Sequence, residues 1–309
     1  MSFYLTILGS SSGLPTSKRN SAAHVLNVHE HFFLIDCGEG TQIQLNRFNI
    51  RLGKINHIFI SHLHGDHIFG LFGLISTFNL LNRENDLHIY AHPEITHTIK
   101  YYKDHFGNKL QYNIIIHPFK TARPTLIYEN KHITVETIPL KHRIPTVGFL
   151  FKEKEKPKNI RKEQIEKYNI PIKEIVKIKQ GADYITKDGT TIKNEKLTLP
   201  PFKLRSYAYC SDTVYSEKYV QYISGVRLLY HETTFLDKDK KLAKLTYHST
   251  ALQAATIAKK ACVEKLLIGH FSARYKDVSA LVKEAKKIFE NTFAVEDGDI
   301  FHIVAERIK

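Results

Sequence analysis

His62-Leu63-His64-Gly65-Asp66-His67 places four side chains that can bind a metal ion within six residues. Residues 58–60 before it are apolar and partly β-branched, which is typical of a strand buried on both faces. Imidazole nitrogens and a carboxylate suit zinc or a similar divalent ion, and their spacing lets neighbouring side chains point toward two separate ions. A solvated loop is the alternative, because the chain holds 18 His. We expect a functional metal site in the loop that begins at Ser61.

The composition is that of a globular protein. The 309 residues are 42% hydrophobic, and no run reaches the roughly 18 apolar residues that a transmembrane helix needs. The N-terminal segment lacks the basic start, apolar stretch and cleavage site of a secretory signal, so we expect a cytoplasmic protein without a membrane partner. Cys37, Cys210 and Cys262 are widely spaced, which predicts buried thiols rather than disulfides. The formal charge of +14 favours a polyanionic partner.

Further polar residues follow predicted strands, which alternate with helical segments as in an α/β protein. The strand ends carry Asp36 after residues 32–35, His142 after 132–139, Asp212 after 206–210, Glu232 after 227–230 and His270 after 263–268. His248 stands at the entrance of a helix predicted at 249–261. Helices are also predicted at 42–48, 68–81, 94–106 and 277–290. Because chemistry gathers at the carboxyl ends of the strands of such a sheet, these side chains are candidates for the same site.

Two basic segments are candidates for contact with a polyanion. Lys18 and Arg19 lie in a loop that could position phosphates without reading bases, although a solvated turn has the same composition. Residues 152–205 hold 15 Lys or Arg against eight Asp or Glu, a net charge of +7, with several prolines and little apolar periodicity. We expect this segment to be an inserted arm rather than a second core.

The motifs resemble those of a known family. The HxHxDH stretch is similar to the signature of the metallo-β-lactamase fold, and the remaining motifs narrow the resemblance to tRNase Z, the tRNA 3′-processing endonucleases. The matching stretches are Pro15-Thr16-Ser17-Lys18-Arg19-Asn20, which is similar to the family's PxKxRN loop, His231-Glu232-Thr233-Thr234 in place of the HEAT box, His248-Ser249-Thr250, and the GHFSxRY motif at 269–275. Residues 152–205 match the family's arm only in part, because its glycine-proline pair and leucine-lysine-glycine pattern are incomplete.

The resemblance implies a fold and a ligand set. It implies a single metallo-β-lactamase domain over residues 1–309, an αββα sandwich of two mixed sheets between helices, with the flexible arm at 152–205 inserted to bind substrate. It implies two zinc ions per chain, although other divalent metals are open. One ion would take His62, His64 and His142, the other Asp66, His67 and His270, with Asp212 as the bridge. Asp36 would orient a metal-bound histidine from behind.

The implied reaction is hydrolysis of a phosphodiester. The resemblance implies removal of the 3′ trailer from precursor tRNA, which leaves a 3′-hydroxyl, by a cytoplasmic homodimer. Asp66 would act on the attacking water, and His248 paired with Glu232 would stabilise charge or protonate the departing oxygen.

Three other functions stay open at this point. The first is a small-molecule hydrolase of the same fold, such as a thioesterase or a cyclic nucleotide phosphodiesterase, which would have little use for a basic arm. The second is an RNA-binding protein with a degenerate site, against which the complete ligand set argues. The third is exonucleolytic processing of RNA.

Overall fold

The computed structural model describes residues 2–106 and 110–308, and the chain divides into two compact units. The first unit contains Met1–Lys152 and Ser206–Ile303. The second contains Glu153–Arg205 and the C-terminal segment Val304–Lys309, which sequence reasoning did not assign to it.

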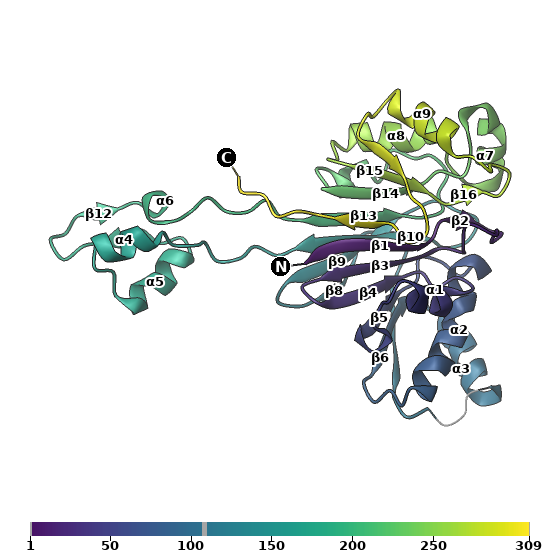
Figure 1. Ribbon diagram of the computed structural model, residues 1–309, viewed down its shortest axis with the longest axis horizontal. Helices are drawn as coiled ribbons and strands as arrows, with labels where there is room; N and C mark the ends of the chain where they lie inside the picture. The colour runs from purple at the N-terminus through teal and green to yellow at the C-terminus, as the bar shows by residue number, and fades with distance from the viewer. Residues whose placement is uncertain (1, 107–109, 309) are drawn as a thin grey trace. The chain divides into compact units, whose positions relative to one another are not determined.

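Two seven-stranded sheets form the centre of the first unit (Figure 1). The first sheet has the order β18 (Ile300–His302), β1 (Phe3–Gly9), β3 (Ala23–Val28), β4 (His31–Ile35), β5 (Ile55–Phe59), β6 (Leu87–Ala91), β7 (Ile114–Pro118). The second has the order β17 (Thr292–Ala294), β15 (Leu266–Gly269), β14 (Leu228–Glu232), β13 (Ser206–Cys210), β10 (Val147–Glu153), β9 (Ile133–Pro139), β8 (Leu126–Glu129). Each sheet mixes parallel and antiparallel pairs, as predicted.

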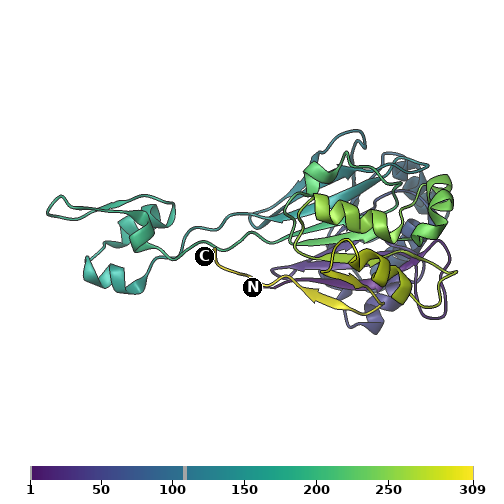
Figure 2. The same ribbon diagram turned by 90° about the horizontal axis from the view of Figure 1, so that it is seen from above.

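Helices cover the outer faces of both sheets, which completes the αββα sandwich (Figures 1 and 2). The first sheet is covered by α1 (Thr41–Arg47), α2 (Gly65–Leu80) and α3 (Ile95–His105), and the second by α8 (Ala251–Lys260) and α9 (Ser279–Lys286), while α7 (Lys240–Thr246) precedes α8. Figure 2 shows α8 and α9 side by side. The shorter elements are β2 (Ser11–Ser12), paired with β16 (Phe271–Ser272), and the 3-10 turns η1 (Leu52–Lys54), η2 (Val220–Ile223) and η3 (Asp237–Asp239).

The alternation of side chains along the strands builds three apolar layers. In β14, Tyr230 packs between the two sheets, whereas Leu229 points to the outer layer with Ala255 and Leu281 from α8 and α9. In β5, Phe59 lies between the sheets and Ile58 lies under α2. This period of two is what holds a sheet that is apolar on both faces between helices.

Helix α2 differs from its predicted form at both ends. It begins at Gly65 rather than residue 68, so Asp66 and His67 lie in its first turn instead of a loop. So apolar a helix would be expected to be buried as core, but Phe69 is 64% exposed and Leu80 is 79% exposed. The helix is apolar on nearly all sides, so periodicity could not tell which side faces the sheet.

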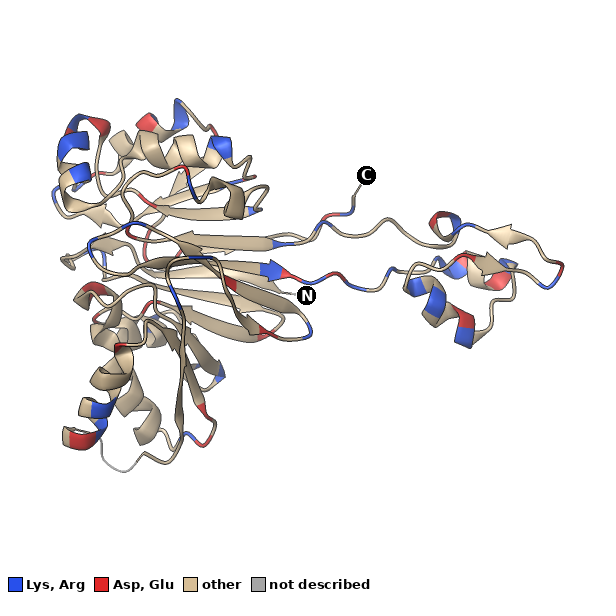
Figure 3. Ribbon diagram, turned by 180° about the vertical axis from the view of Figure 1, so that it is seen from behind, with Lys and Arg blue, Asp and Glu red and all other residues tan. Residues whose placement is uncertain are grey.

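The second unit has a small core of its own, which corrects the expectation of an arm without one. It consists of α4 (Lys162–Lys167), α5 (Ile172–Lys179), α6 (Asn194–Leu197) and the hairpin of β11 (Tyr184–Ile185) and β12 (Thr191–Ile192). Its core contains Ile170, Ile178, Tyr184 and Leu197. Figure 3 shows the Lys and Arg residues of its helices.

A buried ion pair joins the two ends of the inserted segment. Arg205 donates from Nε and from Nη2 to the two carboxylate oxygens of Glu153, each at 2.9 Å. One residue outside this pair, Lys152 and Ser206 are opposite each other in the antiparallel ladder of β10 and β13. Paired strands therefore carry the chain into the insertion and out of it.

Two expectations about single features have different outcomes. Cys37 and Cys210 are buried thiols, but Cys262 is exposed, because it follows the end of α8 in a left-handed turn with φ of 51°. None of the described helices combines the length and apolar character needed to cross a membrane.

Candidate metal centre

Parallel strands bring the candidate site residues together. Strands β4 and β5 are parallel neighbours, so Asp36 and Ser61 leave the first sheet at the same edge. Strands β13, β14 and β15 are also parallel, which places Asp212, Glu232 and His270 at one edge of the second sheet. The two carboxyl edges supply all seven predicted ligands. Function gathers at such edges because the chain can vary there without disturbing the sheet.

The start of α2 is fixed against the loop after β4. The amide of Cys37 donates to the carbonyl of His67 at 2.8 Å, and the amide of Gly70 donates to the carbonyl of Cys37 at 3.0 Å. A Cβ atom on Gly70 would lie 2.0 Å from the carbonyl oxygen of Gly38, so only glycine permits this approach. The close contact holds Asp66 and His67 in place in the first turn.

The first group of ligand atoms comes from three histidines and one carboxylate. His64 Nδ1 lies 3.0 Å from His62 Nε2 and 3.3 Å from His142 Nε2. Asp212 Oδ2 lies 3.6 Å from His62 Nε2 and 3.7 Å from His142 Nε2. These four atoms therefore face a common point.

The second group shares Asp212 with the first but uses its other oxygen. Asp212 Oδ1 lies 3.1 Å from His270 Nε2 and 3.5 Å from His67 Nε2. Asp66 Oδ2 lies 3.4 Å from His67 Nε2 and 3.6 Å from His270 Nε2. The two oxygens of one carboxylate thus face two separate groups of ligand atoms.

The spacing fits divalent metal ions. Ligands at 2.0–2.1 Å from a tetrahedral zinc ion are about 3.4 Å apart, which is within the range of the distances in both groups. The Nε2 atoms of His67 and His270 are buried and accept or donate no hydrogen bond among the described residues. Buried polar atoms are normally satisfied, so two such nitrogens aimed at one point indicate a ligand.

The other ring nitrogen of four of the five histidines has a partner in the protein. His67 Nδ1 lies 2.7 Å from Asp36 Oδ2 and His142 Nδ1 lies 2.8 Å from the carbonyl oxygen of Tyr247. His62 Nδ1 contacts the Ser61 hydroxyl at 3.0 Å, and His270 Nδ1 contacts the Thr234 hydroxyl at 3.1 Å. Such partners fix the tautomer and orientation of a metal-binding imidazole.

Asp36 is the most heavily engaged of these partners. Its carboxylate also accepts hydrogen bonds from the amide and the hydroxyl of Ser61 and from the hydroxyl of Tyr209, at 2.7–2.8 Å. Asp36 itself has a left-handed backbone with φ of 55°. A non-glycine residue in this conformation is uncommon and is often found at a functional site.

The electrostatics of the site favour ionised carboxylates. Burial opposes ionisation of Asp66, but the charge of His67 and the nearby ring of His270 outweigh it and lower its pKa. Burial likewise opposes ionisation of Asp212, and the charges of His270 and His67 lower its pKa. The same attraction, chiefly from Asp66 against the effect of burial, raises the pKa of His67. Carboxylates that stay charged are what cation binding requires.

His248 and Glu232 form a pair beside the second group. His248 Nδ1 lies 3.1 Å from Glu232 Oε1, and the buried Glu232 also accepts hydrogen bonds from the amides of Thr213, Thr234 and Ser249. Burial opposes protonation of His248, but the charge of Glu232 outweighs it and raises the pKa of His248 to about 9. Thr250 caps α8 with a capping box to Gln253, which fixes the helix that follows His248.

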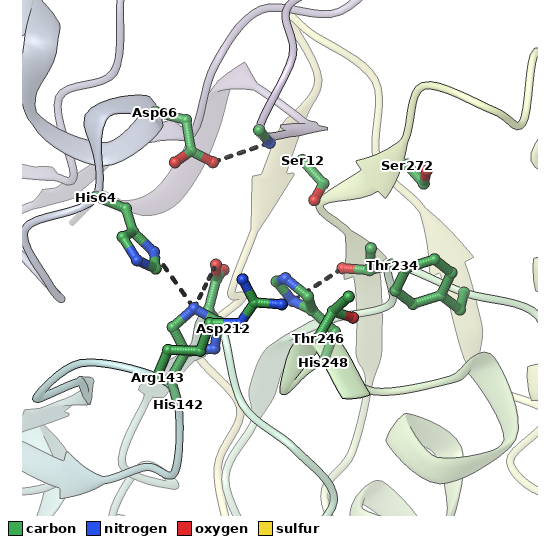
Figure 4. Close-up of a pocket in the computed structure, with 12 residues that line it drawn as sticks. Ser12, His64, Asp66, His142, Arg143, Asp212, Thr234, Thr246, His248 and Ser272 are labelled. Carbon is green, nitrogen blue, oxygen red and sulfur yellow. Dashed lines mark hydrogen bonds and ion pairs between the residues drawn. The ribbon is translucent and has the colours of Figure 1, made fainter. Parts of the chain in front are cut away.

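A cavity of about 260 Å³ opens in front of these residues (Figure 4). This volume takes the reacting part of a substrate but not a whole macromolecule. It is lined by Ser12, Gly13, His64, Asp66, His142, Arg143, Asp212, Thr234, Phe235, Thr246, His248 and Ser272.

The two cations predicted to bind substrate do not line this cavity. Lys18 is exposed in the loop between β2 and β3. Arg19 is half-buried and donates from Nη2 to the carbonyl oxygen of Tyr275 at 2.6 Å. The guanidinium group of Arg19 is thus already engaged within the protein.

Sequence reasoning did not single out several residues that line the cavity. Gly13 donates its amide to Asp66 Oδ2 at 2.9 Å, and Thr234 contacts both His248 and His270. Arg143 directly follows His142, and this position next to a predicted ligand could have pointed to its place in the cavity.

Curated relatives match over nearly the whole chain. The chain is 49% identical over 296 residues to the ribonuclease Z of Bacteroides thetaiotaomicron, a match that covers 96% of this chain and 94% of that protein. It is 45% identical over 295 residues to the ribonuclease Z of Porphyromonas gingivalis, with 96% of this chain and 97% of that protein covered.

Solved structures and a family model match as well. The human tRNase Z, short form, has a TM-score of 0.70 at 26% identity, with 96% of this chain and 98% of that chain covered. The metallo-β-lactamase fold protein YhfI of Bacillus subtilis has a TM-score of 0.70 at 17% identity, with 98% and 100% covered. The family model described as Anti-Pycsar protein Apyc1 matches residues 3–157, which include His62 and His142 but end before Asp212 and His270.

Proposed function

Because the chain belongs to the ribonuclease Z family and has the metallo-β-lactamase fold, we propose that it is a two-zinc endoribonuclease that removes the 3′ trailer from precursor tRNA and leaves a 3′-hydroxyl on the tRNA. The observation that carries the metal-dependent part is the orientation of Asp212, whose two oxygens face two separate groups of ligand atoms. A cytoplasmic location is part of this proposal, because the proposed substrate is precursor tRNA.

The residues that would hold the ions are those brought together at the sheet edges. His62, His64 and His142 would hold one ion, Asp66, His67 and His270 the other, and Asp212 would bridge them. Two ions so bound would neutralise charge on the scissile phosphodiester and make water more acidic. Histidine nitrogens among the donors of both groups support zinc over magnesium, which prefers six oxygen ligands.

Asp66 is proposed to orient the attacking water and to accept its proton. Its lowered pKa keeps it ionised, and the amide of Gly13 holds Oδ2 from the side of the loop after β1. A carboxylate fixed from two sides keeps its position as charge moves during the reaction, which is how preorganised groups lower a barrier.

His248 is proposed to protonate the departing 3′-oxygen or to stabilise its charge. Its pKa of about 9 keeps it protonated at neutral pH, and the hydrogen bond to Glu232 fixes the ring. Asp212, His248 and His270 have side-chain atoms within 4.8 Å of one another, so the acid lies beside the second ligand group. Glu232 acts through His248 and is a positioning residue.

The second unit is proposed to be an arm that binds tRNA away from the cut. Its support is the net charge of +7 over residues 152–205 and the exposure of most of its lysines. Phosphate contacts of this kind add affinity without sequence specificity. Lys18, which is exposed on its loop, is proposed to add a further phosphate contact. Arg19 is instead proposed to hold that loop in place through its hydrogen bond to the carbonyl oxygen of Tyr275.

A homodimer is proposed on the basis of exposed apolar side chains on and directly after α2. Phe69, Leu80 and Leu81 are at least 59% exposed, and they lie on or directly after α2. Exposed apolar patches on soluble proteins often mark interfaces. Sedimentation at several protein concentrations tests this proposal, and a monomer at micromolar concentration contradicts it.

The deciding experiment combines metal analysis with product mapping. Purified protein is dialysed extensively, its bound metals are counted, and it is incubated with precursor tRNA labelled at the 5′ end. We expect two zinc ions per chain and one labelled product that ends in a 3′-hydroxyl at the trailer junction. A ladder of products would show an exonuclease, and binding without cleavage would show an RNA-binding protein.

Small-molecule substrates provide the second arm of this experiment. The proposed enzyme hydrolyses a chromogenic phosphodiester but shows no preference for a cyclic nucleotide or a thioester over precursor tRNA. A preference of that kind would replace the proposal with a small-molecule hydrolase of the same fold.

A further inference from the structure

Arg143 is a cation in the cavity for which the proposed reaction has no assigned role. It lies in the loop between β9 and β10, directly after His142, and its side chain is exposed. It is the only Lys or Arg among the described residues that line the cavity. Its side chain forms no hydrogen bond or ion pair with any other described residue, so its guanidinium group is available to a ligand.

The loop that carries Arg143 is fastened to the segment that carries His248. His142 Nδ1 lies 2.8 Å from the carbonyl oxygen of Tyr247, and the rings of His142 and His248 are 5.1 Å apart. Thr246, one residue before Tyr247, also lines the cavity. In Figure 4 the guanidinium group of Arg143 extends toward the centre of the cavity, in the direction of Asp212 and His248.

This position determines which part of an RNA substrate Arg143 can meet. The reaction breaks the bond between the scissile phosphorus and the 3′-oxygen of the tRNA, and the proton from His248 goes to that oxygen. The tRNA strand must therefore leave the cavity on the side of His248. Arg143, the cation on this side, would face the next phosphate of the tRNA, whereas the scissile phosphate would lie beside the two groups of ligand atoms that share Asp212.

We propose that Arg143 binds the first phosphate on the tRNA side of the cleaved bond and so positions the departing strand beside His248. The proposal rests on the proposed function, because it requires an RNA phosphodiester in the cavity. A guanidinium group suits the task, since its planar donors bind two oxygens of one phosphate at once.

The test uses three variants with their metals bound. Arg143→Gln removes the charge, Arg143→Lys keeps the charge without the paired donors, and Lys141→Gln removes a neighbouring exposed cation that does not line the cavity. Each is assayed on precursor tRNA, on the same RNA with a neutral methylphosphonate at the first tRNA-side phosphate, and on bis(p-nitrophenyl) phosphate. Metal content is measured for each variant.

We expect Arg143→Gln to lower kcat/KM on unmodified precursor tRNA by about 10- to 100-fold, the scale of a charge-assisted hydrogen bond. Arg143→Lys should recover part of this loss, and Lys141→Gln should change it less than threefold. Metal content and activity on the small diester should stay within twofold, because that substrate has no neighbouring phosphate. On the methylphosphonate RNA, wild type and Arg143→Gln should be equally slow, since the contact is already absent.

Other outcomes overturn the proposal. Equal losses from Arg143→Gln and Lys141→Gln would show a general effect of charge, and an additive loss on the methylphosphonate RNA would show that Arg143 does not contact that phosphate. A loss on the small diester would place Arg143 at the scissile phosphate instead. If wild-type protein fails to cleave precursor tRNA at all, the proposed function fails and this proposal with it. If wild type cleaves and Arg143→Gln is unchanged, only the role of Arg143 fails.

Discussion

Replacement of Asp36 by Asn should weaken zinc binding although Asp36 touches no ion in the proposed site. The carboxylate accepts four hydrogen bonds, from the amide and hydroxyl of Ser61, the hydroxyl of Tyr209 and Nδ1 of His67. Asn offers one oxygen and one NH₂ group in the same space. The NH₂ group must therefore replace either Oδ1 or Oδ2, and in either position it faces groups that donate hydrogen bonds to Asp36.

Both orientations of the amide have a cost that follows from these contacts. If the NH₂ group takes the Oδ1 position, it faces the backbone N–H of Ser61, which can only donate a hydrogen bond. With the NH₂ group at the Oδ2 position, the hydroxyls can rotate, but His67 must move its proton from Nδ1 to Nε2, the nitrogen that would bind the metal. An unsatisfied buried donor costs about 1–3 kcal/mol. Loss of a partner behind a metal-binding histidine usually weakens affinity by about 10- to 100-fold.

Zinc affinity and metal-free stability are measured separately to test this reasoning. Competition with a chelating dye gives the zinc affinity, and urea unfolding in the presence of chelator gives the free energy of unfolding. Asp86→Asn serves as the matched control, because its exposed carboxylate accepts a hydrogen bond only from Asn113 among the described residues. Zinc affinity of Asp36→Asn within twofold of wild type would refute the reasoning, even if the variant were less stable.

Two pH-dependent effects are expected. Glu232→Gln should lower the alkaline limit of kcat from near pH 9 by at least one pH unit. The reason is that Glu232 raises the pKa of His248 to about 9, and the acid form of His248 is lost as pH rises through that value. Glu94→Gln is the control, and an unchanged alkaline limit in Glu232→Gln contradicts the role of His248 as the acid. His57→Phe should reduce acid sensitivity, since burial and the neighbouring His88 lower the pKa of His57 from 6.5 to about 3, so that stability present above pH 6.5 is lost as pH falls toward 3. When the pH falls from 8 to 5, the free energy of unfolding of His57→Phe, measured with urea, should rise by about 1–2 kcal/mol relative to that of wild type. The control is His97→Phe, at an exposed position, which should show no such gain. Equal pH dependence of all three proteins would be incompatible with a buried neutral His57.

Much of the fold was predictable because its signals are local. Strand β13 was predicted with the bounds that it has, and β4 and β9 to within one residue. Strands β4 and β13 are short, largely apolar runs, and each is followed by a polar residue. The grouping of the candidate site side chains was predictable in the same way, since the motifs follow strand ends and carry a family resemblance. The structure adds that parallel pairing places those ends at common edges.

The features that sequence reasoning missed depend on contacts between distant residues. Whether Arg19 is available to a substrate is decided by the carbonyl of Tyr275, 256 positions away. The core of the second unit draws Ile178 and Leu197 from short helices and Ile170 from the loop between α4 and α5, and none of these segments is long enough to show a periodic pattern. Local patterns report neither kind of contact.

The ion pair of Glu153 and Arg205 has a consequence for how the protein can change over evolutionary time. The inserted segment starts and ends at neighbouring positions on paired strands, so its ends stay together whatever lies between them. The entropy of closing a loop grows slowly, by about 0.6 kcal/mol for each doubling of its length. Lineages can therefore lengthen, shorten or exchange this segment with little effect on the stability of the two sheets, and the RNA binding proposed for the segment can diverge while the site at the sheet edges is kept.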